Sequence, residues 1–241
     1  MIDYSPEIEA AFKENELHNL LNRPATTKLN LLINRMIEVN KTMNLTAITD
    51  GNDIILKHIV DSASVIKYIP QNARLLDVGT GGGFPSLPIA IIRPDVSVYA
   101  LDSTAKKLKY IDETAKLLEL TNIKTVCGRA EELGKTVNYR ERFDVCTARA
   151  VSALNVLTEL CLPFVKIGGL FLSMKGSSAA EEIDLAKSGV IQLGGTKFTD
   201  ESFSLTFMGE EVLRHIVISK KAKATPPSFP RQYNRITKKP L

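Results

Sequence analysis

The sequence predicts an α/β protein with a mostly parallel sheet, and two observations support this prediction. From about residue 71 onward, short apolar runs typical of buried strands alternate with segments of helical periodicity. The first of these strands is followed by GTGGGF (Gly79–Phe84), a glycine-rich turn of the kind that lets a ligand approach the backbone. Before residue 70 the periodicity is helical, which predicts an N-terminal helical extension over residues 1–70 packed on the sheet domain.

Three helices are expected in this extension. The first begins near Ser5, a good cap, with Pro6 at the first helical position. The third covers Ile54–Tyr68 and ends before Pro70. The second carries one apolar stripe at spacing i, i+3, i+4 and i+7, made of Leu29, Leu32, Ile33 and Met36.

Residues 71–220 are expected to form a Rossmann-like domain with seven strands. The clearest helix between them is Thr104–Leu120. Right-handed crossovers would bring the carboxyl ends of the parallel strands to one edge, where ligands bind. The expected strands are Arg74–Val78, Val96–Leu101, Ile123–Cys127, Phe143–Thr147, Leu170–Met174, Val190–Leu193 and His215–Ser219.

The composition is that of a globular protein, with 44% apolar and 24% charged residues in a chain of 241. No apolar run is long enough to span a membrane, and the acidic, polar N-terminal segment is unlike a signal peptide. The three cysteines, Cys127, Cys146 and Cys161, have no metal-like spacing, and we expect reduced, buried thiols. These features predict a cytoplasmic protein without a metal site.

The C-terminal segment is strongly basic. Ser219–Leu241 holds seven Lys and Arg residues and no acid, so the rest of the chain carries −3 of the total net charge of +4. Phe229 and Tyr233 are interleaved with these cations, a mixture that suits a polyanion with stacking bases. The alternative is a solvated, mobile end of the chain. We treat residues 221–241 as a basic tail. Removal of the residues after Pro230 should weaken RNA binding and leave donor binding almost unchanged.

The glycine-rich turn distinguishes between two ligand classes. Dinucleotide sites favour G-x-G-x-x-G, but here the third glycine position is Phe84. The pattern present is Asp77, Gly79, Gly81 and Gly83, which resembles the donor loop of S-adenosylmethionine-dependent methyltransferases. In such a loop Gly79 and Gly81 would leave room for the methionine part of the donor.

Two further strand ends fit the same donor. Asp102 ends the second strand, where a carboxylate can accept hydrogen bonds from two ribose hydroxyls. After the third strand, Ala130 and Glu131 could supply an apolar wall and an acceptor for an adenine ring. For Glu131 the structural alternative is an acid in the first turn of a helix.

The fourth strand, in FDVCTARAV, limits which methyl-transfer reactions fit the sequence. It lacks the Asn/Asp-Pro-Pro-Tyr/Phe motif of methyltransferases that act on exocyclic amines. Cys146 has no preceding proline and does not end the strand, so it is unlike a pyrimidine-C5 nucleophile. Arg149 does end the strand, and we expect it to face the donor's carboxylate or an RNA phosphate. We predict no dedicated catalytic side chain.

The chain as a whole resembles the ribosomal small-subunit methyltransferase G family, also called the glucose-inhibited division protein B family. The matching stretches are NKTMNLTAITD, KHIVDS, LLDVGTGGGFPSLPIAI, LDSTAKKLKYI, GRAEE, TARAV, MKG and a final PR…KKPL. The chain differs from many members at Ser86, where they carry glycine, and in QYNRI (residues 232–236), where a Gly and a Pro are common.

The resemblance implies a class I S-adenosylmethionine-dependent methyltransferase fold and transfer of a methyl group to N7 of a guanosine in bacterial 16S rRNA. It implies a donor site that includes Gly79, Phe84, Ala130, Glu131 and Arg149. It also implies a partner, 16S rRNA or a small-subunit assembly intermediate, rather than DNA or a membrane, and we expect a monomer. The residues expected to contact RNA are Lys57, His58, Arg231, Arg235, Lys238 and Lys239.

Alternatives remain at this point. A structural role for Lys57 is a surface ion pair with Asp61, one helical turn away. A methyltransferase of a small molecule or a protein would not need the basic tail. A non-catalytic RNA-binding or assembly factor on the same fold would not need an intact donor site.

Overall fold

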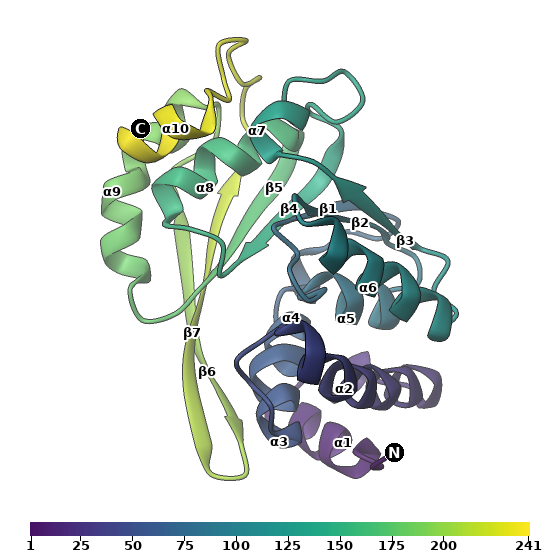
Figure 1. The fold of residues 1–241 in the computed structure, drawn as a ribbon. Coiled ribbons are helices and arrows are strands. Elements are labelled where there is room, and N and C mark those ends of the chain that lie inside the picture. The colour runs from purple at the N-terminus through teal and green to yellow at the C-terminus, as the bar shows by residue number, and fades with distance from the viewer.

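Seven strands form a single sheet in the computed structural model, which describes residues 1–241 (Figure 1). They lie in the order β3-β2-β1-β4-β5-β7-β6. The pairs among β1 to β5 are parallel, and β7 is antiparallel to both of its neighbours. The predicted seven-stranded, mostly parallel sheet is confirmed. The strands are β1 Arg74–Val78, β2 Ser97–Asp102, β3 Ile123–Cys127, β4 Phe143–Arg149, β5 Val165–Lys175, β6 Thr199–Phe207 and β7 Glu210–Lys220.

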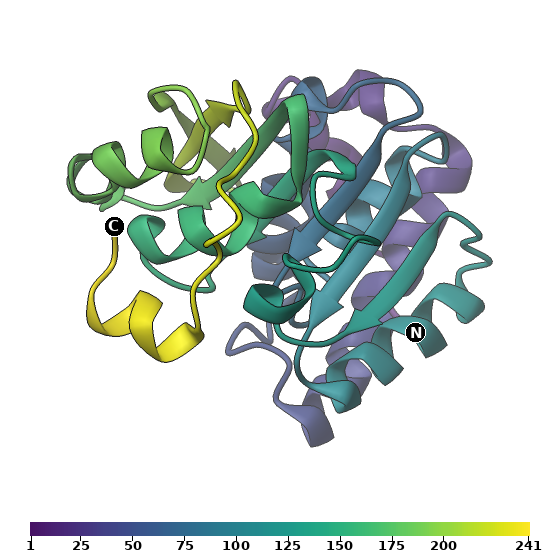
Figure 2. The same ribbon diagram turned by 90° about the horizontal axis from the view of Figure 1, so that it is seen from above.

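Helices cover both faces of the sheet (Figures 1 and 2). Alternation along β1 separates two apolar clusters, because Leu75 packs on one face and Leu76 on the other. The N-terminal helices share the first cluster with the sheet. On that face lie α1 Ser5–Glu14, α2 Arg23–Met43, α5 Ser86–Ile92 and α6 Ala105–Leu117. The other face is covered by α7 Ala130–Leu133, α8 Leu154–Cys161, α9 Ala179–Gln192 and α10 Tyr233–Lys238. No helix combines the length and apolar character needed to cross a membrane.

One expected strand in the C-terminal half of the sheet was wrong, and one strand was not predicted. Val190–Leu193 is not a strand: Val190 continues α9, because Ala179, Ala186 and Val190 recur on its buried face. The strand that takes its place is β6, whose side chains are mostly exposed and therefore gave no apolar run. It forms a hairpin with β7 through Met208 and Gly209, which both have positive φ.

The expected helix over Ile54–Tyr68 is divided. It consists of α3 Gly51–Ile54, a π-helical segment η2 Ile55–Val60, α4 Asp61–Ala63 and a 3₁₀ turn at Ile66–Tyr68. π-helical turns are rare and frequent at functional sites. This one contains Lys57 and His58, two residues selected from the sequence.

The basic tail packs on the protein along α8 (Figure 2). Lys221 is fully buried and donates to the carbonyl of Leu162 at 2.7 Å. Arg231 forms a two-pronged ion pair with the fully buried Glu159. The free charge of this segment is therefore smaller than its sequence indicates. Among the cysteines, Cys146 and Cys161 are buried as expected, but Cys127 is exposed.

Candidate functional site

The carboxyl ends of β1, β2, β3 and β4 surround a cavity of about 520 Å³, here called the donor cavity. Parallel strands bring these ends to one edge of the sheet, so residues far apart in the chain meet there. All seven residues selected from the sequence for donor binding line it: Gly79, Gly81, Phe84, Asp102, Ala130, Glu131 and Arg149.

Three glycines with positive φ shape the first wall, each for its own reason. A Cβ on Gly81 would lie 3.9 Å from the nearest atom, the Gly79 carbonyl oxygen, so the missing side chain leaves open space. A Cβ on Gly79 would lie 2.5 Å from Val151, and one on Gly83 would lie 2.4 Å from Leu87. Gly81 therefore leaves space beside the cavity, whereas Gly79 and Gly83 permit close packing.

The loop is held from below by hydroxyl groups. Ser86, one of the departures from the family pattern, is fully buried and its hydroxyl lies 2.6 Å from that of Thr80. Asp77 is buried beneath the loop, where its Oδ1 accepts from Thr147 at 3.1 Å and its Oδ2 has no hydrogen-bond partner. Burial raises the pKa of Asp77 to about 6.

Asp102 lies at the edge between the loop and the cavity. Its Oδ2 accepts from the Gly81 amide at 3.1 Å and its Oδ1 accepts from the Thr104 amide at 2.8 Å. Each carboxylate oxygen retains acceptor capacity, and the side chain lines the cavity. Asp102 can therefore hold the glycine loop and accept from a pair of ligand hydroxyls at the same time.

A further wall of the donor cavity is formed by the start of α7. Ala130 is 8% exposed, and Glu131 is half-buried with no hydrogen-bond partner on its carboxylate. Together with the space at Gly81, this set matches S-adenosylmethionine chemically: a small cradle, a carboxylate for two hydroxyls, and an apolar wall beside a free acceptor. The residues present fit the donor that the sequence predicts.

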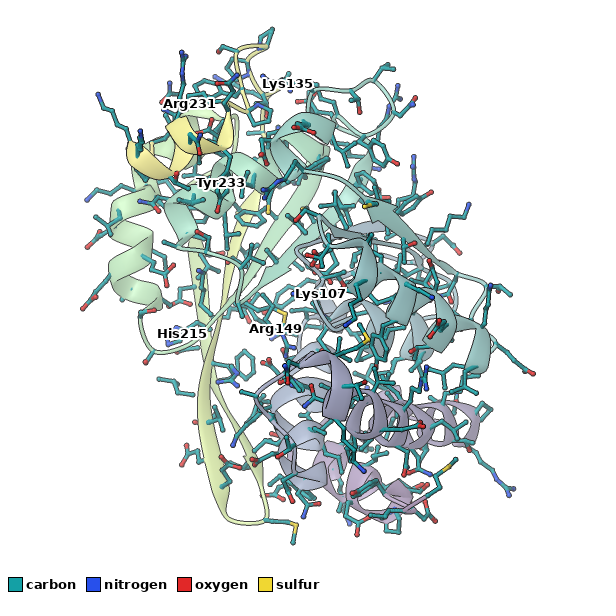
Figure 3. All side chains as sticks on the ribbon, viewed as in Figure 1. Lys107, Lys135, Arg149, His215, Arg231 and Tyr233 are labelled. Atoms are coloured by element: carbon teal, nitrogen blue, oxygen red, sulfur yellow. The ribbon has the colours of Figure 1, made fainter.

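Arg149 ends β4 and is fixed by the N-terminal segment (Figure 3). Its Nη1 donates to Asp61 Oδ2 at 2.8 Å and to the Lys57 carbonyl at 2.9 Å, and its Nη2 donates to His58 Nδ1 at 3.1 Å. Asp61 is 3% exposed and also accepts from Arg214 at 3.0 Å. The surface pair between Lys57 and Asp61, the structural alternative considered from the sequence, is not formed.

His58 is held in the neutral form. Its ring stacks on Phe84 with 4.8 Å between centroids, and burial followed by the charge of Arg149 lowers its pKa to about 3. Nδ1 lies 3.1 Å from both Arg149 Nη2 and the Lys57 carbonyl oxygen, and Nε2 lies 2.9 Å from the hydroxyl of Thr46. Both ring nitrogens are thus engaged.

Comparisons with known proteins identify the family of the chain. A family model described as rRNA small subunit methyltransferase G matches residues 25–206. The chain is 45% identical over 205 residues to the ribosomal RNA small subunit methyltransferase G of Acetivibrio thermocellus, covering 85% of this chain and 84% of the relative. It is 39% identical over 241 residues to that of Desulfitobacterium hafniense, covering 100% of both. The chain belongs to the small-subunit rRNA methyltransferase G family.

Solved structures support the fold independently. A SAM-dependent O-methyltransferase from Thermotoga maritima superposes with a TM-score of 0.54 at 14% identity, covering 78% of this chain and 72% of that one. The fold is therefore the class I methyltransferase fold.

A second cavity of about 650 Å³ adjoins the donor cavity and is here called the acceptor cavity. The two share His58, Arg149, Ala150 and Val151 as lining residues. The acceptor cavity also contains the pair Lys175–Glu182, at 2.7 Å. The fixed Arg149–His58 pair, here called the partition, therefore borders both cavities, which adjoin beside it.

The residues expected to contact RNA are found in three settings. Lys57 lines the acceptor cavity, but its Nζ is paired with Asp53 at 3.0 Å and Glu210 at 2.6 Å. His58 is buried in the partition, and Arg231 is paired with Glu159. Three cations are exposed without an ion-pair partner on or beside α10: Arg235, Lys238 and Lys239.

Several lining residues were missed by the sequence reasoning. Thr46 and Asp61 lie in NKTMNLTAITD and KHIVDS, motifs that mark the family, but no spacing rule connects them with Arg149, 88 residues beyond Asp61. Lys107 lines the donor cavity from the exposed side of α6. Tyr233 lines the same cavity, although the tail containing it was assigned only to RNA.

Proposed function

We propose that this protein transfers the methyl group of S-adenosylmethionine to N7 of a guanosine in 16S rRNA, with the base seated in the acceptor cavity. S-adenosylmethionine supplies a methyl group activated on a sulfonium. Asp102, the Gly81 space and Ala130–Glu131 hold the donor on one side of the partition, and the acceptor cavity receives the base on the other.

The observation that supports N7 is that each titratable side chain of the acceptor cavity is already engaged. His58 is neutral and has both ring nitrogens occupied, Asp61 is held by two arginines, and Glu182 accepts from Lys175, Ser178 and the Leu154 amide. The neighbours of Glu182 also lower the pKa of its carboxyl. An exocyclic amine requires a group that removes a proton, whereas N7 has an in-plane lone pair and no proton, so alignment and exclusion of water are sufficient.

We further infer that the substrate is 16S rRNA or a small-subunit assembly intermediate and that the protein acts as a monomer in the cytoplasm, where this RNA is found. The exposed cations Arg235, Lys238 and Lys239 support an RNA partner. A methyltransferase of a small molecule would gain nothing from them.

The test uses small-subunit particles and free 16S rRNA from cells that lack the protein, together with purified enzyme and methyl-labelled donor. N7-methylguanosine carries a fixed positive charge, so reduction followed by aniline should cleave the RNA at one guanosine. An Asp102→Asn enzyme is the control for donor-dependent labelling. Label on an exocyclic amine, a ribose oxygen or a pyrimidine carbon would refute the N7 assignment, and equal labelling of many guanosines would refute the specific site.

A further inference from the structure

Tyr233, in the tail segment QYNRI (residues 232–236), lies at the donor cavity. Residues 233–238 form the short helix α10. Tyr233 at its start lines the donor cavity together with Gly128, Arg129 and Ala130 from the end of β3. Figure 3 shows Tyr233 and Arg231 side by side on the tail, on the side of the molecule where α7 lies.

The position of Tyr233 is fixed by buried anchors on both sides. Before it, Arg231 is held by Glu159, with nitrogen–oxygen distances of 2.6–3.0 Å, and its backbone amide donates to the same carboxylate at 2.7 Å. After it, Ile236 is fully buried in the apolar cluster of α8 and α9. Upstream, Arg140 donates to the Phe229 carbonyl at 2.8 Å. The ring of Tyr233 is therefore held at the cavity although 39% of the residue is exposed.

The surroundings of the ring suit a nucleobase. The Arg129 guanidinium lies 5.7 Å from the centroid of the Tyr233 ring, and both residues line the cavity beside Ala130 and Glu131. Asp102, the acceptor for ribose hydroxyls, ends the neighbouring strand, and its partner across the sheet is Cys127, one residue before Gly128. This is the end of the cavity expected to receive adenine, and aromatic faces and guanidinium planes both stack on bases.

We propose that Tyr233 is part of the donor site of this chain and packs against the adenine of S-adenosylmethionine, with Arg129 beside it. The tail then completes the donor cavity as well as presenting cations to RNA. This revises the expectation that removing the tail leaves donor binding unchanged.

The test measures binding, so it is independent of the methylated position. Calorimetry compares S-adenosylhomocysteine binding to the unmodified protein and to Tyr233→Phe, Tyr233→Ala and Asn234→Ala variants. Loss of the ring should raise the dissociation constant about tenfold, because stacking on an aromatic side chain is worth about 1–3 kcal/mol per base. Tyr233→Phe keeps the ring and should stay within about twofold. Asn234 is exposed on the same helix and serves as the matched control.

A second ligand locates the effect along the donor. Methylthioadenosine carries adenine and ribose without the amino-acid end, so Tyr233→Ala should weaken its binding by the same factor. Unchanged binding of both ligands by Tyr233→Ala would overturn the proposal, as would a loss confined to S-adenosylhomocysteine. Thermal unfolding of each ligand-free variant checks that α10 still packs. If Tyr233→Phe binds the ligands as weakly as Tyr233→Ala, the hydroxyl group rather than the ring contributes the affinity, and the proposed packing on adenine is overturned.

Discussion

Replacement of Arg149 by lysine tests the partition between the two cavities. Arg149 uses its fork for three contacts at 2.8–3.1 Å, to Asp61, the Lys57 carbonyl and His58. A lysine ammonium can keep the ion pair with Asp61, but it cannot reach all three partners in the planar arrangement of the guanidinium. Two hydrogen bonds are lost, and each is worth about 1–1.5 kcal/mol. We expect the free energy of unfolding to fall by about 2–3 kcal/mol, with a decrease in Tm of about 5–10 °C.

The effect on activity should exceed what the stability loss alone produces. At a temperature where Arg149→Lys is fully folded, we expect kcat to fall at least tenfold, since the shared wall no longer keeps donor and base aligned. Arg214→Lys is the matched control, because Arg214 also pairs with Asp61 but lies away from the donor cavity. Urea unfolding and single-turnover methylation give the two readouts. An unfolding free energy of Arg149→Lys within about 0.5 kcal/mol of the parent value would refute this stability effect. A larger kcat loss for Arg214→Lys than for Arg149→Lys would refute the effect on alignment.

Three further outcomes follow from the donor cavity. Asp102→Asn removes one charged acceptor and should raise the dissociation constant of S-adenosylmethionine by about 10- to 100-fold in calorimetry; an unchanged constant would remove Asp102 from the site. Gly79→Ala should destabilise the protein more than Gly81→Ala in thermal unfolding, because both glycines have positive φ but only a Cβ at Gly79 clashes, 2.5 Å from Val151. Gly81→Ala should mainly weaken donor binding. A greater loss of stability for Gly81→Ala than for Gly79→Ala would contradict the loop geometry. The pKa of Asp77 is raised to about 6, so its ionisation opposes folding. The free energy of unfolding of the parent relative to Asp77→Asn should be highest below pH 4 and fall by about 3 kcal/mol as the pH rises to 7. A difference in unfolding free energy that does not change with pH would refute the burial effect.

The donor cavity could be predicted from the sequence because its residues follow single strands. Gly81, Asp102 and Ala130 each lie at or shortly after the end of a strand, and parallel strands bring such positions to one edge whatever the rest of the chain does. Local spacing therefore specified which residues meet. Local spacing did not specify the role of each residue. Gly79, for example, lines the cavity and also permits close packing against Val151.

The partition could not be predicted in the same way. Asp61 and Arg149 are 88 residues apart, and a π-helical segment aims the Lys57 carbonyl and His58 at the guanidinium. Neither the pairing nor a widened helical turn has a local sequence signal. β6 was missed for a related reason: its exposed, polar residues become a strand only by pairing with β7.

The charges of the acceptor cavity bear on release of the methylated base as well as on its binding. Methylation at N7 adds a positive charge that no proton loss can remove. Lys57 is paired with Asp53 and Glu210, and Lys175 is paired with Glu182. Arg149 and Arg214 share the single carboxylate of Asp61 and His58 is neutral, which leaves this cluster with one unbalanced positive charge. Such a cluster attracts a phosphate-bearing strand and disfavours the cationic product relative to the neutral guanine. The same electrostatics can therefore favour both substrate entry and product departure.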